Sequence, residues 1–310
     1  MRIVFMGTPD FAQVSLQALV EAGLRPVAVV TQPDKPRGRG YTLTPPPVKV
    51  YAEAQGIPVY QPETLKNGAF DPVLGELAPD LIVVVAYGKI LPRSVLEAPK
   101  HGCINVHGSL LPAYRGAAPM QRAIMEGCDR TGVTTMYMAE GLDTGDMLLT
   151  GEIAIEENDN FETIHDKLAA CGAEVLLRTV AAIEDGTLTR IPQNEAEATY
   201  AAKIEKADCL IDFSKDARSV HNQIRGLSPI PLSFTHLPSG KLLKVTEARV
   251  GELSASGCPG EILAADHNGI TVSCGTGSVT LLRVVPEGKK PMAAADFVRG
   301  RQCVVGDVLA

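Results

Sequence analysis

The sequence contains no apolar run long enough to cross a membrane as a helix, since its longest candidate, Leu81 to Ala86, has the length of one strand. The amino terminus passes from a single arginine into a short apolar run and a Gly-Thr-Pro-Asp turn, which is not typical of a signal peptide. With 45% hydrophobic and 21% charged residues, the composition predicts a globular protein rather than a disordered or membrane-embedded one.

The cysteine patterns of a disulfide scaffold or a zinc site are also absent. The seven cysteines are odd in number and scattered, with no CxxC motif and no closely spaced Cys/His pair. We therefore expect reduced, structural thiols, no bound metal and a cytoplasmic location. These cysteines are Cys103, Cys128, Cys171, Cys209, Cys258, Cys274 and Cys303.

The glycine fingerprint of a dinucleotide site is incomplete. Gly7 follows the first predicted strand, but the two later glycine positions hold Pro9 and Ala12. These side chains remove the close backbone approach that a pyrophosphate needs. A nicotinamide-dependent dehydrogenase is therefore disfavoured.

Short β-branched runs alternate with helix-sized segments in the first half of the chain, which predicts an α/β fold with a Rossmann-like, mostly parallel sheet. A helix is expected after the first strand, because Asp10 and Gln13 have capping-box spacing. A second, longer helix is expected over 160–184, with Asp159 and Glu162 at its start and Gly186 as its stop. Its apolar face is expected to hold Ile164, Leu168, Val175, Val180 and Ile183. The predicted strands are 3–5, 27–30, 57–60, 81–86 and 103–106.

The second half has a different pattern. Residues 187–206 show no periodicity and are interpreted as a linker, which divides the chain into a catalytic domain at 1–186 and a second domain at 207–310. Beyond a helix at 214–225, closed by Gly226, five short strands alternate with turns. This pattern favours a small oligonucleotide-binding-type β-barrel, with a β-sandwich as the alternative. The strands are expected within 231–236, 241–250, 260–266, 269–274 and 278–285.

Charge is distributed unevenly along the chain, whose formal net charge is −7. Residues 1–202 carry 16 Lys+Arg against 25 Asp+Glu, whereas residues 203–310 carry 13 against 11. A mildly basic second domain is compatible with local binding of a polyanion, but this excess alone does not distinguish such binding from ordinary surface variation.

The strongest candidate site follows the predicted strand at 103–106. Asn105 and His107 are two residues apart, so they share one side of the strand at its carboxyl end, where open parallel sheets bind ligands. An amide and an imidazole can serve acyl chemistry as an oxyanion donor and a proton-transfer group. A turn cap next to a surface histidine is the alternative.

A carboxylate can reach the same edge from the segment GLDTGD. Asp143 and Asp146 lie there in a glycine-rich loop between two apolar strands, and a carboxylate of this loop could hold His107 in a useful tautomer. By itself, this segment is also compatible with a plain turn.

A second functional segment is predicted at 33–47. It contains five prolines and three cations, Lys35, Arg37 and Arg39, against one acid. Such a long, Pro-rich connection favours a semi-rigid loop that could contact phosphates. A merely solvated loop is the alternative.

These motifs together resemble the 10-formyltetrahydrofolate-dependent formyltransferases. The resemblance rests on the Asn105/His107 pair, SLLPAYRGAAP after it, GLDTGD, the opening VFMGTPDFA, VVVAYGKILP, IRGLSPIP and PGEILAAD. It covers nearly the whole chain and is greatest for members of that family that formylate the amino group of methionyl initiator tRNA. By this resemblance the catalytic triad is Asn105, His107 and Asp143.

The resemblance also implies the binding partners. The cosubstrate 10-formyltetrahydrofolate would lie along Ser109, Leu110, Leu111 and Pro112 and near the strand end at Tyr87, Gly88, Lys89, Ile90 and Leu91. Lys35, Arg37 and Arg39 would meet the acceptor arm of the tRNA, and the second domain would be an OB-like tRNA-binding domain. We expect a monomer with no membrane contact.

Two other functions compete with this interpretation. A folate-dependent formyltransferase acting on a small amine, such as an amino-sugar or glycinamide nucleotide, would share the catalytic half but would not obviously need the Pro/Arg loop. A noncatalytic RNA-binding protein would leave the Asn/His/Asp set idle.

Overall fold

The computed structural model describes residues 1–37, 42–251 and 257–310. It forms two compact units. The first comprises 1–116, 131–153 and 165–200, and the second comprises 117–130, 154–164 and 201–310. Segments of the two units alternate along the chain. The division into a catalytic domain at 1–186, a linker at 187–206 and a second domain at 207–310 stays a prediction.

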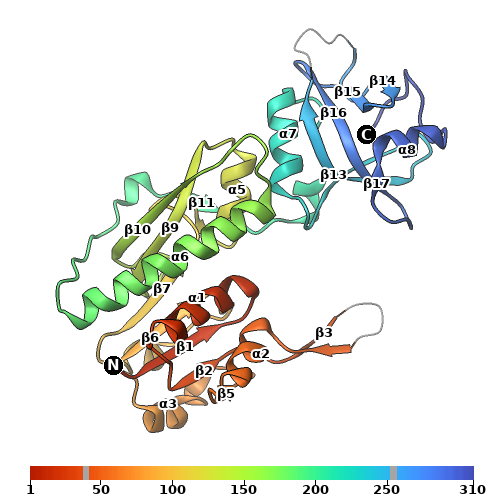
Figure 1. The fold of residues 1–310 in the computed structure, drawn as a ribbon. Helices are drawn as coiled ribbons and strands as arrows, with labels where there is room; N and C mark the ends of the chain where they lie inside the picture. The colour runs from red at the N-terminus through yellow and green to blue at the C-terminus, as the bar shows by residue number, and fades with distance from the viewer. Residues whose placement is uncertain (38–41, 252–256) are drawn as a thin grey trace. The chain divides into compact units, whose positions relative to one another are not determined.

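The first unit is built on a seven-stranded sheet of order β10-β9-β7-β6-β1-β2-β5 (Figure 1). The pairs β1/β2, β2/β5, β1/β6 and β6/β7 are parallel, whereas β7/β9 is antiparallel. The predicted α/β, mostly parallel sheet is therefore confirmed. The strands are β1 (Ile3–Gly7), β2 (Ala28–Val30), β5 (Val59–Tyr60), β6 (Leu81–Val85), β7 (Cys103–His107), β9 (Arg130–Tyr137) and β10 (Met147–Ala154).

Helices cover the sheet because its strands are apolar on both faces. On one side, Val4, Met6, Ile82 and Val84 pack in a core cluster with residues of α3 and α4. On the β7–β9–β10 part, α6 runs along the strands, and Thr179 of α6 shares a 2.8 Å hydrogen bond with Thr135 of β9 (Figure 1). The helices of the first unit are α1 (Asp10–Glu21), α2 (Pro47–Ala54), α3 (Asp71–Leu77), α4 (Arg93–Leu96) and most of α6 (Phe161–Glu184), whereas α5 (Pro119–Met125) belongs to the second unit.

The predicted helix over 160–184 is confirmed as α6, and its predicted apolar face is buried. Its amino terminus differs in detail, since Asn160 and Thr163 exchange side-chain and backbone hydrogen bonds of 3.0 Å. The capping box predicted for α1 is wrong, because α1 has Pro9 as N-cap and no side-chain cap hydrogen bond. Gln13 is instead part of the ordinary helical ladder.

The order of the strands creates a switch point between β1 and β6. From β1 the chain continues outward to β2 and β5, whereas β6 continues in the other direction to β7. The segments after β1 and β6 meet at the carboxyl edge, where Thr8 Oγ1 donates a 3.0 Å hydrogen bond to the carbonyl of Tyr87. Such a switch point is the usual ligand crevice of an open parallel sheet.

The segment predicted as a semi-rigid loop contains a short hairpin. Its strands are β3 (Lys35–Arg37) and β4 (Thr42–Thr44), paired antiparallel with Lys35 opposite Thr44. The intervening residues, including Arg39, lie outside the described part of the chain.

The second unit carries one antiparallel sheet of order β12-β13-β16-β15-β14, with β17 paired to β16. All five predicted strands are present. The inward side chains of β13, β14, β15 and β16 form one core with α7 and α8, whereas Phe234 of β12 packs in a separate cluster with Cys209 and Leu227. These antiparallel strands agree with the prediction for the second domain. The elements are α7 (Ala217–Gly226), β12 (Ser233–His236), β13 (Leu242–Val250), β14 (Ile262–Asp266), β15 (Gly269–Ser273), β16 (Ser278–Pro286), β17 (Met292–Ala293) and α8 (Ala294–Arg299).

Further short elements complete the described structure, and only some of them lie in or next to the predicted linker. They are β8 (Arg115–Gly116), β11 (Tyr200–Ala201) and single 3₁₀ turns at Lys66–Gly68, Glu195–Glu197 and Lys206–Cys209. None of the helices in the described residues has the length and apolar character needed to cross a membrane. None of the seven cysteines, which all lie in described residues, forms a disulfide, and burial raises the pKa of Cys103 to about 12.

Candidate active site

Strand β7 brings Asn105 and His107 to the carboxyl edge of the sheet. It is held between β6 and β9, with Asn105 opposite Val84 on one side and Met136 on the other. Alternation along the strand directs Asn105 and His107 to one face. Val106 faces α6, where a side chain on Gly172 would contact it.

The imidazole of His107 lies between two oxygen acceptors and is only 6% exposed. Its Nε2 is 3.0 Å from the carbonyl oxygen of Tyr114, and its Nδ1 is 3.6 Å from Oδ2 of Asp143. A ring protonated on both nitrogens would donate toward each oxygen. The geometry therefore suits a group that gains and loses a proton during a reaction.

Asp143 occupies the loop between β9 and β10 with a φ of 52°, in the left-handed region. Its Oδ2 accepts a 2.8 Å hydrogen bond from the backbone N–H of Gly116. The same oxygen faces His107. Gly145 closes the loop, and glycine is required there because any Cβ would overlap the carbonyl oxygen of Tyr137.

The side chain of Asn105 is half-buried and makes no hydrogen bond in the described part of the chain. Its amide N–H is therefore free to donate to a substrate oxygen. A preorganised donor of this kind stabilises the negative charge that develops on a carbonyl oxygen under attack.

Two residues that sequence reasoning missed, Gln193 and Arg115, support the loop of Asp143. Gln193 Nε2 donates to the carbonyl oxygens of Asp143 and Gly145, at 2.7 and 2.8 Å. Arg115 Nε donates to Gln193 Oε1 at 2.9 Å. The sequence held no signal for Gln193, since it lies in the stretch without periodicity that we interpreted as a linker.

The predicted folate segment after His107 is firmly held. Ser109 Oγ donates to the carbonyl of Ala113 at 2.6 Å, and the N–H of Leu111 donates to Thr134 Oγ1 at 3.0 Å. Leu110 packs over Gly132, where no side chain would fit. The Ser109–Pro112 segment is therefore held by hydrogen bonds and packing. It follows directly after β7, the strand that carries Asn105 and His107.

The second predicted folate segment, Tyr87–Leu91, is of mixed exposure. Tyr87 and Leu91 are buried in the core cluster, and Ile90 is 88% exposed. Burial raises the pKa of Tyr87 to about 12, and its hydroxyl has no hydrogen-bond partner in the described residues. Gly88 has a φ of 78° at this turn.

Lys89 in this segment is bound by the protein's own backbone. Its Nζ donates to the carbonyl oxygens of Pro62 and Glu63, at 2.7 and 2.8 Å. Burial, with a further contribution from Lys35, lowers the pKa of the Lys89 ammonium.

The cations of the predicted phosphate-binding segment are described only in part. Lys35 Nζ donates to Gln32 Oε1 at 2.6 Å. Arg37 belongs to β3, and Arg39 lies outside the described residues. Their proposed role stays a prediction.

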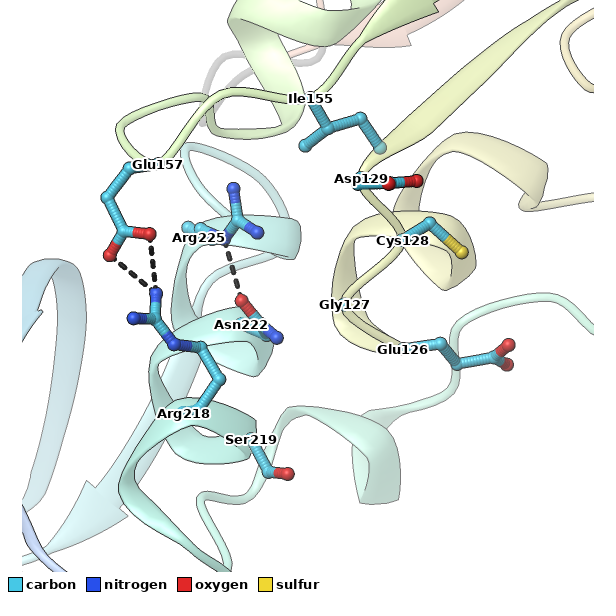
Figure 2. Close-up of a pocket in the computed structure, with 10 residues that line it drawn as sticks. All are labelled: Glu126, Gly127, Cys128, Asp129, Ile155, Glu157, Arg218, Ser219, Asn222 and Arg225. Atoms are coloured by element: carbon cyan, nitrogen blue, oxygen red, sulfur yellow. Dashed lines mark hydrogen bonds and ion pairs between the residues drawn. The ribbon is translucent and has the colours of Figure 1, made fainter.

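A separate cavity of about 390 Å³ lies within the second unit (Figure 2). Figure 2 shows the guanidinium of Arg218 paired with the carboxylate of Glu157 and Arg225 bonded to Asn222. None of the predicted site residues lines this cavity. Within the described ranges, no group of three or more His, Cys, Asp and Glu side chains could hold a metal ion.

Comparison with known proteins identifies the family. Residues 1–180 match the model of the formyl transferase family, and residues 203–302 match the model of the formyl transferase C-terminal domain. The chain belongs to the formyl transferase family. This family uses folate, so the carboxyl edge of the sheet, with Asn105, His107 and Asp143, is the natural candidate active site of this formyl transferase.

Full-length relatives of this formyl transferase have been described from several bacteria. The methionyl-tRNA formyltransferase of Citrifermentans bemidjiense is 49% identical over all of this chain and 96% of the relative. That of Bacillus licheniformis is 50% identical over 96% of this chain and 95% of the relative.

Solved structures share the fold at lower sequence identity. An N-formyltransferase from Helicobacter canadensis, in complex with folinic acid and dTDP-3-aminofucose, has a TM-score of 0.67 at 20% identity, over 91% of this chain and 99% of that one. HypX from Aquifex aeolicus, in complex with tetrahydrofolic acid, has a TM-score of 0.64 at 18% identity, over 96% of this chain and 47% of HypX. The predicted fold is thus that of known formyl-transferring and folate-binding proteins.

Proposed function

We propose that this formyl transferase moves the formyl group of 10-formyltetrahydrofolate to the free amino group of methionyl initiator tRNA. The observation that carries the chemistry is the 3.6 Å approach of His107 Nδ1 to Asp143 Oδ2, beside the free amide of Asn105. The acceptor is supported by full-length relatives of 47–50% identity that are methionyl-tRNA formyltransferases.

The reaction needs an oxyanion donor and a path for one proton. The amino nitrogen attacks the formyl carbon, the carbonyl oxygen becomes an oxyanion, and the bond from carbon to the folate nitrogen then breaks. The amine loses a proton, and the folate nitrogen gains one. The products are the formylated aminoacyl-tRNA and tetrahydrofolate.

The three residues of the triad serve different parts of this scheme. Asn105 donates to the oxyanion, a contact whose loss from other enzymes costs about 3 kcal/mol of transition-state stabilisation. His107 transfers a proton between the amine and the folate nitrogen or stabilises the oxyanion as an imidazolium. Asp143 orients His107 and stabilises its charged form.

Mass spectrometry of methionyl initiator tRNA tests the function directly. Incubation with the enzyme and 10-formyltetrahydrofolate should add one formyl mass to the amino acid. A parallel incubation with amino-sugar and glycinamide nucleotides tests the alternative acceptors. Formylation of a small amine without formylation of the tRNA would contradict the proposal, as would binding of RNA without any folate-dependent transfer.

A further inference from the structure

The side chain of Gln193 binds the main chain of the loop that carries Asp143. Both N–H groups of its amide are used, one for the carbonyl of Asp143 and one for that of Gly145. Both carbonyls belong to the turn in which Asp143 has its positive φ. A non-glycine residue holds such a conformation only where its surroundings fix it.

Gln193 is in turn oriented by Arg115, which has no exposed surface. The Nε of Arg115 donates to Gln193 Oε1, and its two terminal nitrogens donate to both carboxylate oxygens of Glu195, at 2.9 and 2.8 Å. The hydrogen bond from Arg115 lowers the pKa of the Glu195 carboxylate. With every polar atom of the amide satisfied, Gln193 has a single orientation.

The backbone on either side of Arg115 contacts the catalytic candidates. The carbonyl of Tyr114 accepts from His107 Nε2, and the N–H of Gly116 donates to Asp143 Oδ2. The segment Tyr114–Gly116, with the buried Arg115 at its centre, therefore supports the site in three ways. Its backbone binds the ring of His107 and the carboxylate of Asp143, and Arg115 orients Gln193, which binds the main chain of Asp143.

We propose that Gln193 is a positioning residue that sets the carboxylate of Asp143 against His107. The inference rests on the proposed function, since it gives Asp143 a role in formyl transfer. Gln193 itself need not touch either substrate. Small displacements of a catalytic group cost up to about a hundredfold in rate, so the loss of its two hydrogen bonds should appear in kcat.

Two substitutions separate positioning from stability. Gln193→Glu keeps the length of the side chain and an acceptor for Arg115, but it presents oxygen atoms to the carbonyls of Asp143 and Gly145 instead of N–H donors. Gln193→Ala removes all three contacts. Asn194→Ala is the matched control, because the neighbouring Asn194 caps the turn at Glu195–Glu197 and bonds only to Ala196 and Glu197.

Kinetics provide the first readout. Both Gln193 variants should lower kcat by about tenfold to a hundredfold with less than a threefold change in the KM for folate, and Asn194→Ala should change neither. In an Asp143→Asn background, Gln193→Ala should lower kcat by less than about twofold, because the two residues act as one unit. An unchanged kcat, or a full multiplicative loss in the double variant, would overturn the inference.

Crystal structures of the wild-type enzyme and Gln193→Glu provide a readout that does not depend on the acceptor. The variant should show Asp143 Oδ2 displaced from His107 Nδ1 by about 1 Å or more. An undisplaced carboxylate would overturn the inference even if the enzyme proved to use another amine. Wild-type inactivity with methionyl-tRNA would instead contradict the proposed function and leave this structural test decisive for Gln193.

Discussion

At the scale of single residues, the candidate site combines one free donor with two strongly held groups. The amide of Asn105 makes no hydrogen bond in the described residues, whereas His107 and Asp143 each contact backbone and one another. This difference fits the proposed chemistry, because an oxyanion donor must be available to substrate while a proton-transfer pair must keep its geometry. It also allows the roles to be tested separately.

Asn105→Ala should lower kcat by about a hundredfold to a thousandfold, because one oxyanion donor is lost. The protein should remain folded, since the Asn105 side chain makes no hydrogen bond in the described residues. Steady-state kinetics and circular dichroism measure the two effects. A folded variant with normal turnover would remove Asn105 from the mechanism.

His107→Ala should also lower turnover strongly, by at least about a hundredfold, because the proton-transfer group is removed. The nearby His101, on a surface turn before β7, gives a matched control in His101→Ala. If His107→Ala keeps near-wild-type turnover, the proton-transfer role belongs to another group.

At the scale of elements, the roles of the β3–β4 hairpin and of the helix α7 can each be tested by substitution. The sequence of the hairpin segment is rich in proline and contains Lys35, Arg37 and Arg39, and α7 begins with a side-chain cap. Asp216 accepts hydrogen bonds from the N–H and the hydroxyl of Ser219, at 3.0 and 2.6 Å. Both features depend on only a few residues.

Replacement of Arg37 and Arg39 by Gln should raise the KM for tRNA and leave the KM for folate unchanged, because fewer phosphates are neutralised. The slope of log(kcat/KM) for tRNA against log salt should flatten accordingly. The double variant Lys66→Gln/Lys100→Gln, at two exposed lysines of the first unit, removes the same charge and serves as the control. An unchanged salt slope in the hairpin variant would count against phosphate contact at this segment.

Asp216→Ala should destabilise the second unit by about 1 kcal/mol, the usual effect of losing a helix N-cap. Hydrogen bonds from Ser219 hold the pKa of Asp216 below its ordinary value of 3.8. The carboxylate therefore stabilises the fold above pH 3.8, and this stabilisation is lost as the pH falls through the lowered folded-state pKa.

Urea unfolding of wild type and Asp216→Ala across pH 3–7 measures this effect. The difference in the free energy of unfolding should be constant near neutral pH and should shrink in the acid range. Lys215→Ala, a neighbouring exposed substitution, should show no such trend. A difference that is independent of pH down to pH 3 would argue against the ionised cap.

At the scale of the whole molecule, two compact units each have a buried apolar cluster of their own. Proteins with two cores commonly depart from two-state unfolding. Leu281 is fully buried in the core of the second unit, and its truncation should cost about 2–5 kcal/mol there.

Scanning calorimetry of Leu281→Ala tests this division. The wild type should show a calorimetric enthalpy larger than the van't Hoff enthalpy, and the variant should lower the temperature of one component only. Leu168→Ala, in α6 of the first unit, should affect the other component. Equal shifts of a single two-state transition in both variants would contradict independent cores.

The sequence alone predicted the main strands, the helices α1, α6 and α7, and the residues of the candidate triad. Period-two and period-3.6 apolar patterns are local, so they predicted the strands of the parallel sheet, the buried face of α6 and the five antiparallel strands. The two-residue spacing of Asn105 and His107 fixed their common side of β7, because side chains alternate along a strand. The family resemblance added Asp143.

Only the tertiary structure decided how the triad is supported. The hydrogen bonds of Gln193 reach the Asp143 loop across about fifty residues of sequence, and no periodicity records such a contact. The start of α1 could not be predicted from residue spacing either. Asp10 and Gln13 have the spacing of a capping box, but the N-cap residue of α1 is Pro9. Long-range hydrogen bonds depend on which segments the folded chain brings together, and that information is not local.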